Sequence, residues 1–362
     1  MQPCRYNFNP GPAPLPRPVL EQMQRELLDF EGSGMSILEL SHRDALYERV
    51  HHAAIADLRS ILGCPEEYSI LFMSGGAAAQ FDLVPMHLLL PGRHAAYLVT
   101  GLWSEMALRA GRRWGDAREV WSSAATSYDR VPERGDFVVD PAAAYVHYTS
   151  NNTIVGTQFP EVPDAVGVPL VCDMTSDLLS RPLDVSRFGL LYASAQKNLG
   201  VAGVTVVIIH RTVLERCNAR VPQPLDYTRM AATNSLLNTP PVFAIYVLGL
   251  VVKYQLAQGG LTTIAARNAA KPARLYAAID NSGGFYRGCA RPAHRSQMNI
   301  TFRLPTPELE ARFIAASVQA GLVGLQGHRT VGGIRASLYN GVSLEAVQAL
   351  VVFMQDFQRL CG

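Results

Sequence analysis

At the centre of the chain the sequence reads Tyr192-Ala193-Ser194-Ala195-Gln196-Lys197-Asn198-Leu199-Gly200, where an apolar strand runs into a turn that carries a lysine. The 362 residues include only three lysines, Lys197, Lys253 and Lys271, and arginine supplies nearly all the remaining positive charge. Burial can lower the pKa of a lysine until its neutral amine attacks carbonyl carbons, whereas a guanidinium stays protonated. Lys197 is therefore the first candidate for a Schiff base. The alternative for a single lysine is a solvated residue at the end of a strand.

Apolar runs on both sides of this stretch predict a mostly parallel sheet. The runs cover residues 69–73, 95–99, 145–149, 168–172, 190–195 and 204–210. They are continuous rather than alternating, which is typical of strands buried on both faces, and helical patterns lie between them. The sequence therefore predicts an α/β fold with right-handed crossovers. Ligands bind at the carboxyl ends of such strands, where Trp103, Asp173 and Lys197 fall.

The pattern divides the chain into three parts. Residues 1–16 form a proline-rich arm that we expect to associate with the active site and the small domain. Residues 17–260 form a large domain, which begins with a helix over 18–30 and includes a buried helix at 242–252. Residues 261–362 form a smaller α+β domain, in which a connecting helix precedes a strand at 298–304, a helix opened by Thr306-Pro307-Glu308 and a last helix after Ser343.

Two further features suggest anion binding. Ser74-Gly75-Gly76-Ala77-Ala78-Ala79 lies between a predicted strand and a helix, where small residues let backbone amides approach a phosphate. Taken alone this signal is weak, since any tight turn between a strand and a helix needs small residues. Basic side chains also gather at His42-Arg43 and at His328-Arg329 with Arg335. A solvated basic pair explains the first of these clusters equally well.

Charge and cysteine content limit the class of protein. A net charge of +2 indicates neither a nucleic-acid surface nor an acidic tail. The six cysteines show no metal-binding spacing, so we expect reduced thiols, no metal site and a cytoplasmic location. No stretch has the length of a signal peptide core or of a membrane-spanning helix, so we expect no membrane association.

Lysine, aspartate and a small-residue turn together match the needs of pyridoxal phosphate. Its aldehyde requires a lysine, its pyridine nitrogen requires a carboxylate and its phosphate requires backbone donors. An isolated Asp173 is more often a helix cap, and an isolated Trp103 is more often core. Their joint placement on one predicted sheet is what favours a cofactor site.

Several motifs, in order, resemble one family. They are Phe8-Asn9-Pro10-Gly11-Pro12, Ser41-His42-Arg43, Gly75-Gly76 with Gln80-Phe81, Ser194-Ala195-Gln196-Lys197-Asn198, Asn238-Thr239-Pro240-Pro241, and Gly327-His328-Arg329 with Gly333-Ile334-Arg335-Ala336-Ser337. The chain resembles the phosphoserine aminotransferases from about Tyr6 to its C-terminus. The resemblance implies a fold-type I pyridoxal-phosphate enzyme that converts 3-phosphohydroxypyruvate and L-glutamate to O-phospho-L-serine and 2-oxoglutarate in serine biosynthesis. It leaves open 4-phosphohydroxythreonine of pyridoxine biosynthesis as a further substrate.

The resemblance also implies roles for single residues. Lys197 is similar to the lysine that holds the cofactor and then acts as the base. The cofactor contacts implied are Asp173 at the ring nitrogen, Trp103 on the ring face, Thr153 near the ring hydroxyl, and Ala77, Ala78, Gln196, Asn238 and Thr239 at the phosphate. The last two of these would come from the second subunit of a homodimer. The implied substrate residues are Arg335 for the α-carboxylate and His42, Arg43, His328 and Arg329 for the distal anion.

Two departures from the family stand out. Many bacterial members carry an arginine at the position of Ala78, and members commonly have a proline where this chain reads Ser150-Asn151-Asn152.

Alternative functions are alanine-glyoxylate transamination, cysteine desulfuration, a cofactor-binding regulator and an inactive homologue. The basic clusters argue against the small uncharged substrates of alanine-glyoxylate transamination. No cysteine lies in a segment that resembles a mobile catalytic loop, which argues against desulfuration, and no basic recognition helix is evident, which argues against a regulator. Because Lys197, Asp173 and Arg335 are all present, the enzyme reading is preferred.

Overall fold

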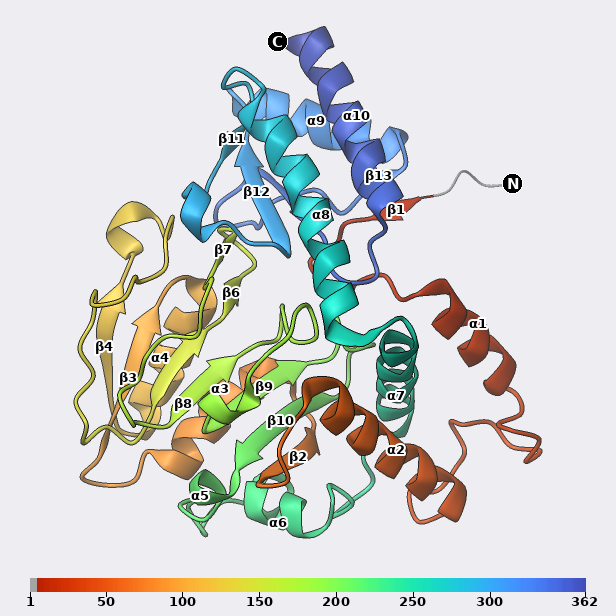
Figure 1. The fold of residues 1–362 in the computed structure, drawn as a ribbon, viewed down its shortest axis with the longest axis vertical. Coiled ribbons are helices and arrows are strands. Elements are labelled where there is room, and N and C mark those ends of the chain that lie inside the picture. Colours follow the sequence, from red (N-terminus) through yellow and green to blue (C-terminus); the bar gives the residue numbers. More distant parts are fainter. Residues whose placement is uncertain (1–4) are drawn as a thin grey trace.

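The computed structural model describes residues 5–362, so Cys4 of the sequence lies outside the described residues. A seven-stranded sheet forms the centre of the molecule, with the strand order β2-β10-β9-β8-β5-β3-β4 (Figure 1). The strands are β2 (Tyr68–Met73), β3 (His94–Val99), β4 (Asp116–Ser122), β5 (Val146–Thr149), β8 (Leu170–Asp173), β9 (Leu190–Ser194) and β10 (Thr205–His210). Only β10 runs antiparallel to its neighbours β2 and β9. The mostly parallel sheet predicted from the sequence is confirmed.

The antiparallel strand has a simple cause. β9 ends at Ser194 and β10 begins at Thr205, and this connection is too short to carry a crossover helix. β10 therefore returns beside β9, and the intervening turn, which contains Lys197, stays at the carboxyl end of β9.

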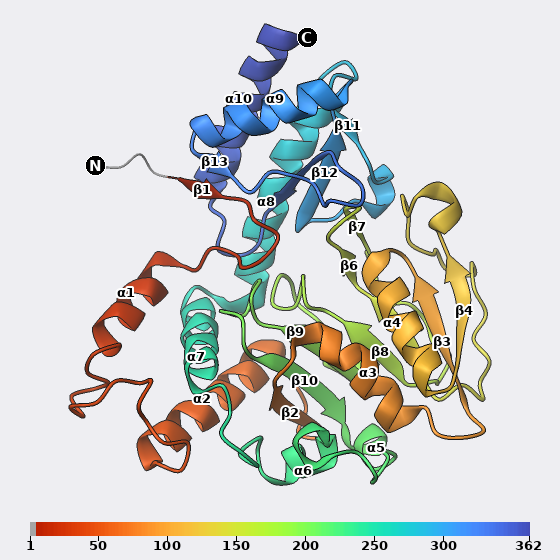
Figure 2. The ribbon, with the colours of Figure 1, turned by 180° about the vertical axis from the view of Figure 1, so that it is seen from behind.

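Helices cover both faces of this sheet (Figures 1 and 2). α3 (Gly76–Leu88) and α4 (Leu102–Trp114) pack on one face, and α2 (Ala45–Leu62) and α7 (Val242–Ala257) pack on the other. Along β2 the alternation is direct, because Ile70 and Phe72 join one core while Leu71 and Met73 join the other. Both faces are buried, which explains why the strands are apolar without a break.

The C-terminal part has a separate core. Its sheet consists of β11 (Arg287–Gly288), β12 (Asn299–Arg303) and β14 (Ile334–Ser337), and its helices are α9 (Pro307–Gln319) and α10 (Leu344–Cys361). The arm joins this part, since β1 (Tyr6–Asn7) pairs in parallel with β13 (Leu322–Val323). Phe8 is fully buried in the same core. Figure 2 shows β1 and β13 side by side, far in sequence but adjacent in space.

One helix belongs to both cores. α8 (Gly260–Asp280) contributes Leu261 and Ile264 to the large core and Leu275 and Ile279 to the small one. In Figure 1 it runs from the region of α7 upward past β12.

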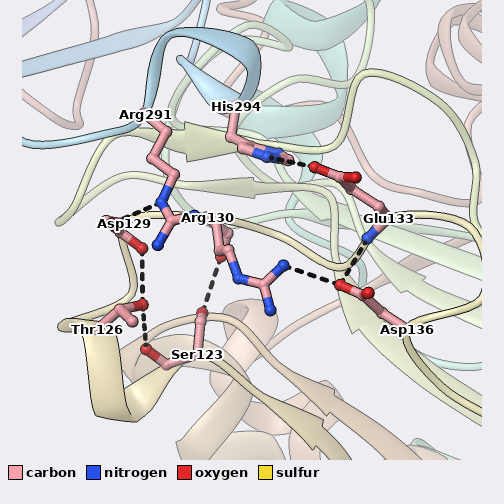
Figure 3. A network of polar contacts seen from close by, with 8 residues as sticks. All are labelled: Ser123, Thr126, Asp129, Arg130, Glu133, Asp136, Arg291 and His294. Carbon is pink, nitrogen blue, oxygen red and sulfur yellow. Dashed lines mark hydrogen bonds and ion pairs between the residues drawn. The ribbon is translucent and has the colours of Figure 1, made fainter.

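A second contact between the large and the small part of the chain consists of polar side chains (Figure 3). There Arg291 Nε donates to Asp129 Oδ2 at 2.9 Å, and His294 Nε2 lies 3.4 Å from Glu133 Oε1.

The remaining α-helices and strands are short, and the first helix ends earlier than the sequence predicts. They are α1 (Arg17–Glu26), β6 (Asn151–Asn152), β7 (Thr157–Gln158), α5 (Arg211–Leu214) and α6 (Tyr227–Ala232). The sequence predicts a first helix over 18–30, but the helix ends at Glu26. The chain turns instead, because the Phe30 amide donates to Met35 O and the Phe30 ring is buried against Tyr246.

Among residues 5–362, no single helix is long and apolar enough to cross a membrane. By length and composition the pair α7 and α8 passes that test jointly, with a bend of 86° between them.

Candidate active site

A cavity of about 410 Å³ opens at the carboxyl ends of β5, β8 and β9. The central sheet, the start of α3, the N-terminal arm and the segment that leads into β14 all contribute to its walls. Of the fourteen site residues predicted from the sequence, eight line this cavity: Ala77, Ala78, Trp103, Thr153, Asp173, Gln196, Lys197 and Arg335. His328 is a ninth. Residues separated by up to 258 positions in the chain therefore meet at one edge of the sheet, where parallel strands place ligands.

Lys197 lies in the turn after β9 and faces this cavity. Burial lowers the pKa of its amine to about 8, and the nearby carboxyl of Asp173 opposes that shift. The arm lies directly over it. A methyl group added at Gly11 would stand 3.5 Å from Lys197 Cγ, and the Ala13 amide donates to Gln196 O at 2.8 Å. The arm thus shields from water an amine that is readily deprotonated.

Asp173 ends β8, the strand beside the one that leads to Lys197. Burial raises the pKa of its carboxyl, while hydrogen bonds from Thr175 and the charge of Lys197 oppose the rise. The Thr175 amide donates to Asp173 Oδ1 at 2.9 Å, and Thr175 Oγ1 accepts from the Ser194 amide at 3.2 Å. The carboxylate is held in a fixed orientation, as a partner for a protonated ring nitrogen has to be.

Trp103, Thr153 and Arg335 form a chain of hydrogen bonds. Trp103 Nε1 donates to Thr153 Oγ1 at 3.0 Å, and Arg335 Nη1 donates to Thr153 O at 3.1 Å. Arg335 is only 6% exposed, yet its Nε has no hydrogen-bond partner among the described residues. A buried guanidinium with an unused donor is suited to a bound carboxylate.

The turn before α3 presents backbone amides to the cavity. The helix begins at Gly76, and its first three amides have no acceptor four residues back. Two of them belong to Ala77 and Ala78. Gly75 has φ 95° and Gly76 φ 70°, values that favour glycine, and a methyl group at Gly75 would meet Ala79 Cβ at 2.7 Å. The positive end of the helix dipole and these free amides fit a phosphate.

These features fit pyridoxal phosphate part by part. Lys197 fits the aldehyde, Asp173 the ring nitrogen, Trp103 the ring face and the start of α3 the phosphate. In addition, Gln196 Oε1 and Thr149 Oγ1 are buried in the cavity wall without a partner in the described part of the chain. Unsatisfied buried polar atoms at one site indicate a polar ligand.

Some predicted residues do not line this cavity. His42 and Arg43 lie just before α2, Asn238 and Thr239 lie between α6 and α7 and are exposed, and Arg329 is exposed beside His328. The pKa of His328 is lowered by partial burial and by the charges of Arg335 and Arg329. Within a single copy of the chain, the basic side chains at the cavity are Lys197, His328 and Arg335.

The sequence reading overlooked several lining residues, among them Thr149, Asn151, Thr175 and Ser176. Thr149 could have been predicted, because it is the last residue of the predicted strand at 145–149. In the structure it pairs with Asp173. The Ser150-Asn151-Asn152 segment, for which no role is predicted, is buried, and Asn151 and Asn152 form β6. Asn151 Nδ2 donates to Ser176 Oγ and to Asn299 Oδ1, both at 2.8 Å. It links the cavity wall to β12 of the small core, a contact that no local pattern reveals.

Comparison with known proteins agrees with this geometry. Residues 5–350 match the model of the aminotransferase class-V family. The phosphoserine aminotransferases of Lysinibacillus sphaericus and Geobacillus kaustophilus are 52% and 53% identical to the chain over 354 residues, and each alignment covers 98% of both proteins.

Solved structures give the same result. Phosphoserine aminotransferase from Bacillus circulans subsp. alkalophilus superposes with a TM-score of 0.97 at 49% identity, and 99% of each chain is covered. The pyridoxal-phosphate-bound enzyme of Trichomonas vaginalis superposes with a TM-score of 0.92 at 37% identity, over 97% of this chain and 99% of that one. The resemblance read from the motifs is confirmed, and the chain belongs to the class-V aminotransferases and, among them, to the phosphoserine aminotransferase family.

Proposed function

We propose that the chain is an aminotransferase that uses pyridoxal phosphate to exchange an amino group between L-glutamate and 3-phosphohydroxypyruvate. The products are 2-oxoglutarate and O-phospho-L-serine. The observation that carries this proposal is the meeting of Lys197, Asp173 and Arg335 in one cavity beside the free amides of α3. Membership of the phosphoserine aminotransferase family supports the choice of substrates.

The bound cofactor supplies an electron sink for the amino group that is exchanged. The residues of the chain do the rest. Lys197 Nζ would move the proton from the Cα of the amino donor to the cofactor, and in the second half-reaction it would move a proton back to the Cα of the amino acceptor. Its lowered pKa keeps a useful fraction of neutral amine near neutral pH. Asp173 would hold a proton on the ring nitrogen, and Trp103 would cover one face of the ring.

Arg335 and His328 define the substrate side of the cavity. We assign the α-carboxylate to Arg335, whose buried Nε is unpaired among the described residues. The distal anion is either a phosphate or the γ-carboxylate of glutamate, and we assign it to His328 and Arg329. No arginine stands at Ala78, so the phosphate depends on the remaining basic residues.

We also propose a homodimer with shared active sites. Five apolar side chains of α1 and the segment after it are exposed, namely Leu20, Leu27, Leu28, Met35 and Leu38, and Leu28 is 84% exposed. Water-exposed apolar side chains concentrated in one segment indicate a surface that another chain covers. His42, Arg43, Asn238 and Thr239 do not line the cavity of their own chain, so in this proposal they complete the site of the partner.

Separate cores support the division into an arm (1–16), a large domain (17–260) and a small domain (261–362), although Phe8 of the arm packs within the small core. We propose a cytoplasmic location, which the free thiols of Cys64, Cys172, Cys217, Cys289 and Cys361 support.

A half-reaction assay tests the function. The enzyme loaded with pyridoxal phosphate is mixed with O-phosphoserine, serine or alanine, and the loss of its visible absorbance is followed. We expect phosphoserine to react fastest by a wide margin, and Lys197→Ala to abolish the characteristic absorbance. Equal rates for the three amino acids would disprove the phosphate assignment, and an unchanged spectrum would disprove the role of Lys197.

A further inference from the structure

The turn at residues 338–342 follows β14, the strand that carries Arg335. Tyr339 of this turn is fully buried, and its hydroxyl donates to Pro10 O at 2.9 Å. Pro10 belongs to the arm that covers Lys197. The turn is therefore in contact with the cover of the active site as well as with the strand that positions Arg335.

Asn340 ties the same turn to the segment around Lys197. Its backbone amide donates to Oδ1 of Asn198, the residue after Lys197, at 3.0 Å. Its side-chain Nδ2 donates to Leu179 O at 2.8 Å, and its Oδ1 accepts from Asn268 Nδ2 at 2.8 Å. One residue of the small domain thus contacts the catalytic turn, the large domain and the helix α8 that joins them.

Lys271 holds this turn from the side of α8. It is 3% exposed, and its Nζ donates to Leu338 O and Tyr339 O at 2.8 Å and to Val342 O at 3.2 Å. An ammonium group has three donors, and all three are used on the turn. Asn268 stands three residues earlier on α8, on the same face of the helix. Two neighbouring side chains of the interdomain helix therefore hold one turn.

Lys271 has no role in the chemistry proposed for the active site. Its side chain does not line the cavity that contains Lys197. No carboxylate in the described chain forms an ion pair with it. Burying an ammonium group is costly unless it is hydrogen-bonded, so the three carbonyls account for its presence there. Lys253, the third lysine, is exposed on α7.

We propose that Lys271 and Asn340 are positioning residues, which fix the 338–342 turn so that Arg335 stands at the correct distance from Lys197. This inference rests on the proposed transamination, in which Arg335 binds the α-carboxylate of every substrate. The turn connects the strand of the carboxylate clamp to the segment of the catalytic lysine. It passes through Asn340 and Asn198 and uses no residue that touches the substrate.

This role predicts a particular kinetic signature. A loosened turn lets Arg335 move relative to Lys197, so both glutamate and 3-phosphohydroxypyruvate should bind more weakly by a similar factor. The cofactor contacts of Asp173 and Trp103 come from the large domain and should be unchanged. KM should therefore rise for both substrates while kcat and cofactor content stay nearly constant.

The experiment compares Lys271→Met and Asn340→Ala with two matched controls. Lys253→Met makes the same change at an exposed lysine, and Asn281→Ala removes an exposed asparagine at the end of α8. Steady-state kinetics give KM and kcat for both substrates. Calorimetric titration of the pyridoxal form with 2-oxoglutarate, which has no amino group to transfer, measures binding apart from turnover.

Loss of a buried hydrogen bond should raise both KM values and the 2-oxoglutarate dissociation constant by roughly fivefold to fiftyfold in each test variant. The controls should match the wild type. Because both residues hold the same turn, the double variant should lose less than the product of the two single losses. Should Lys271→Met fail to fold, Asn340→Ala provides the same comparison.

Unchanged 2-oxoglutarate binding in folded test variants would overturn the inference, as would a fall in kcat at constant KM or equal losses in the controls. Failure of the wild-type enzyme to react with phosphoserine would instead refute the proposed function. The two failures are therefore distinguishable.

Discussion

Replacement of Arg335 by lysine is the sharpest test of the substrate side. The guanidinium donates from Nη1 to Thr153 O at 3.1 Å, which leaves Nε and the other amino group for a substrate carboxylate. Lysine preserves the positive charge but replaces a planar fork with a single point of contact. Arg335→Lys therefore removes one of two parallel hydrogen bonds to the carboxylate without removing the attraction between the charges.

The size of the effect follows from that lost bond. A hydrogen bond to a charged group contributes about 1.5 to 3 kcal/mol, so KM for both substrates should rise roughly tenfold to 150-fold. Little of this is screened by water, because Arg335 is 6% exposed. The pyridoxal phosphate content should not change, since no predicted cofactor contact is altered.

Steady-state kinetics with both substrates measure the effect, and Arg359→Lys is the matched control because Arg359 is exposed near the end of α10. O-phosphoethanolamine, tested as a competitive inhibitor, gives a second control. It lacks the α-carboxylate, so Arg335→Lys should leave its inhibition constant unchanged. An equal loss for phosphoserine and for this analogue would refute the carboxylate assignment, and so would a KM that does not change.

Three further predictions concern the cofactor side. Gly75→Ala should weaken pyridoxal phosphate binding by roughly tenfold, because φ 95° strains alanine and its methyl group meets Ala79; equilibrium dialysis of the holoenzyme measures this. Burial lowers the pKa of Lys197 to about 8, so the amine is mostly protonated below that pH. The rate of cofactor uptake by the apoenzyme should therefore increase as the pH rises through 8, and an increase centred above pH 10 would contradict this prediction. Trp103→Phe keeps a ring but loses the bond to Thr153, so the dissociation constant of the cofactor should rise by roughly threefold to tenfold, whereas no change would show the bond to be dispensable.

Much of the large domain could be predicted from the sequence because its strands are buried on both faces. Such strands are continuous apolar runs, and each predicted run overlaps a strand of the central sheet. β4 was overlooked, since Asp116, Arg118 and Glu119 interrupt its apolar pattern at the edge of the sheet. β14 was overlooked as well, because four residues around Arg335 give too short a pattern to separate from a loop.

The site was partly predictable for a related reason. Lys197, Asp173 and Trp103 follow strands, so the rule for parallel sheets places them together without any knowledge of distance. The closeness of Arg335 and of the arm could only be inferred by resemblance. It depends on hydrogen bonds such as Tyr339 to Pro10, which join residues 329 positions apart in the sequence. Pairings of that kind leave no local periodicity.

The pairing of β1 with β13 has a consequence for synthesis of the chain. Phe8 is synthesised long before Leu322, Ile334 and Met354, which belong to the same core. The arm has no place to dock until the small domain has been translated, whereas the large core can form earlier. The cover over Lys197 is therefore assembled last, and a chain that terminates before β13 would leave its reactive amine open to water.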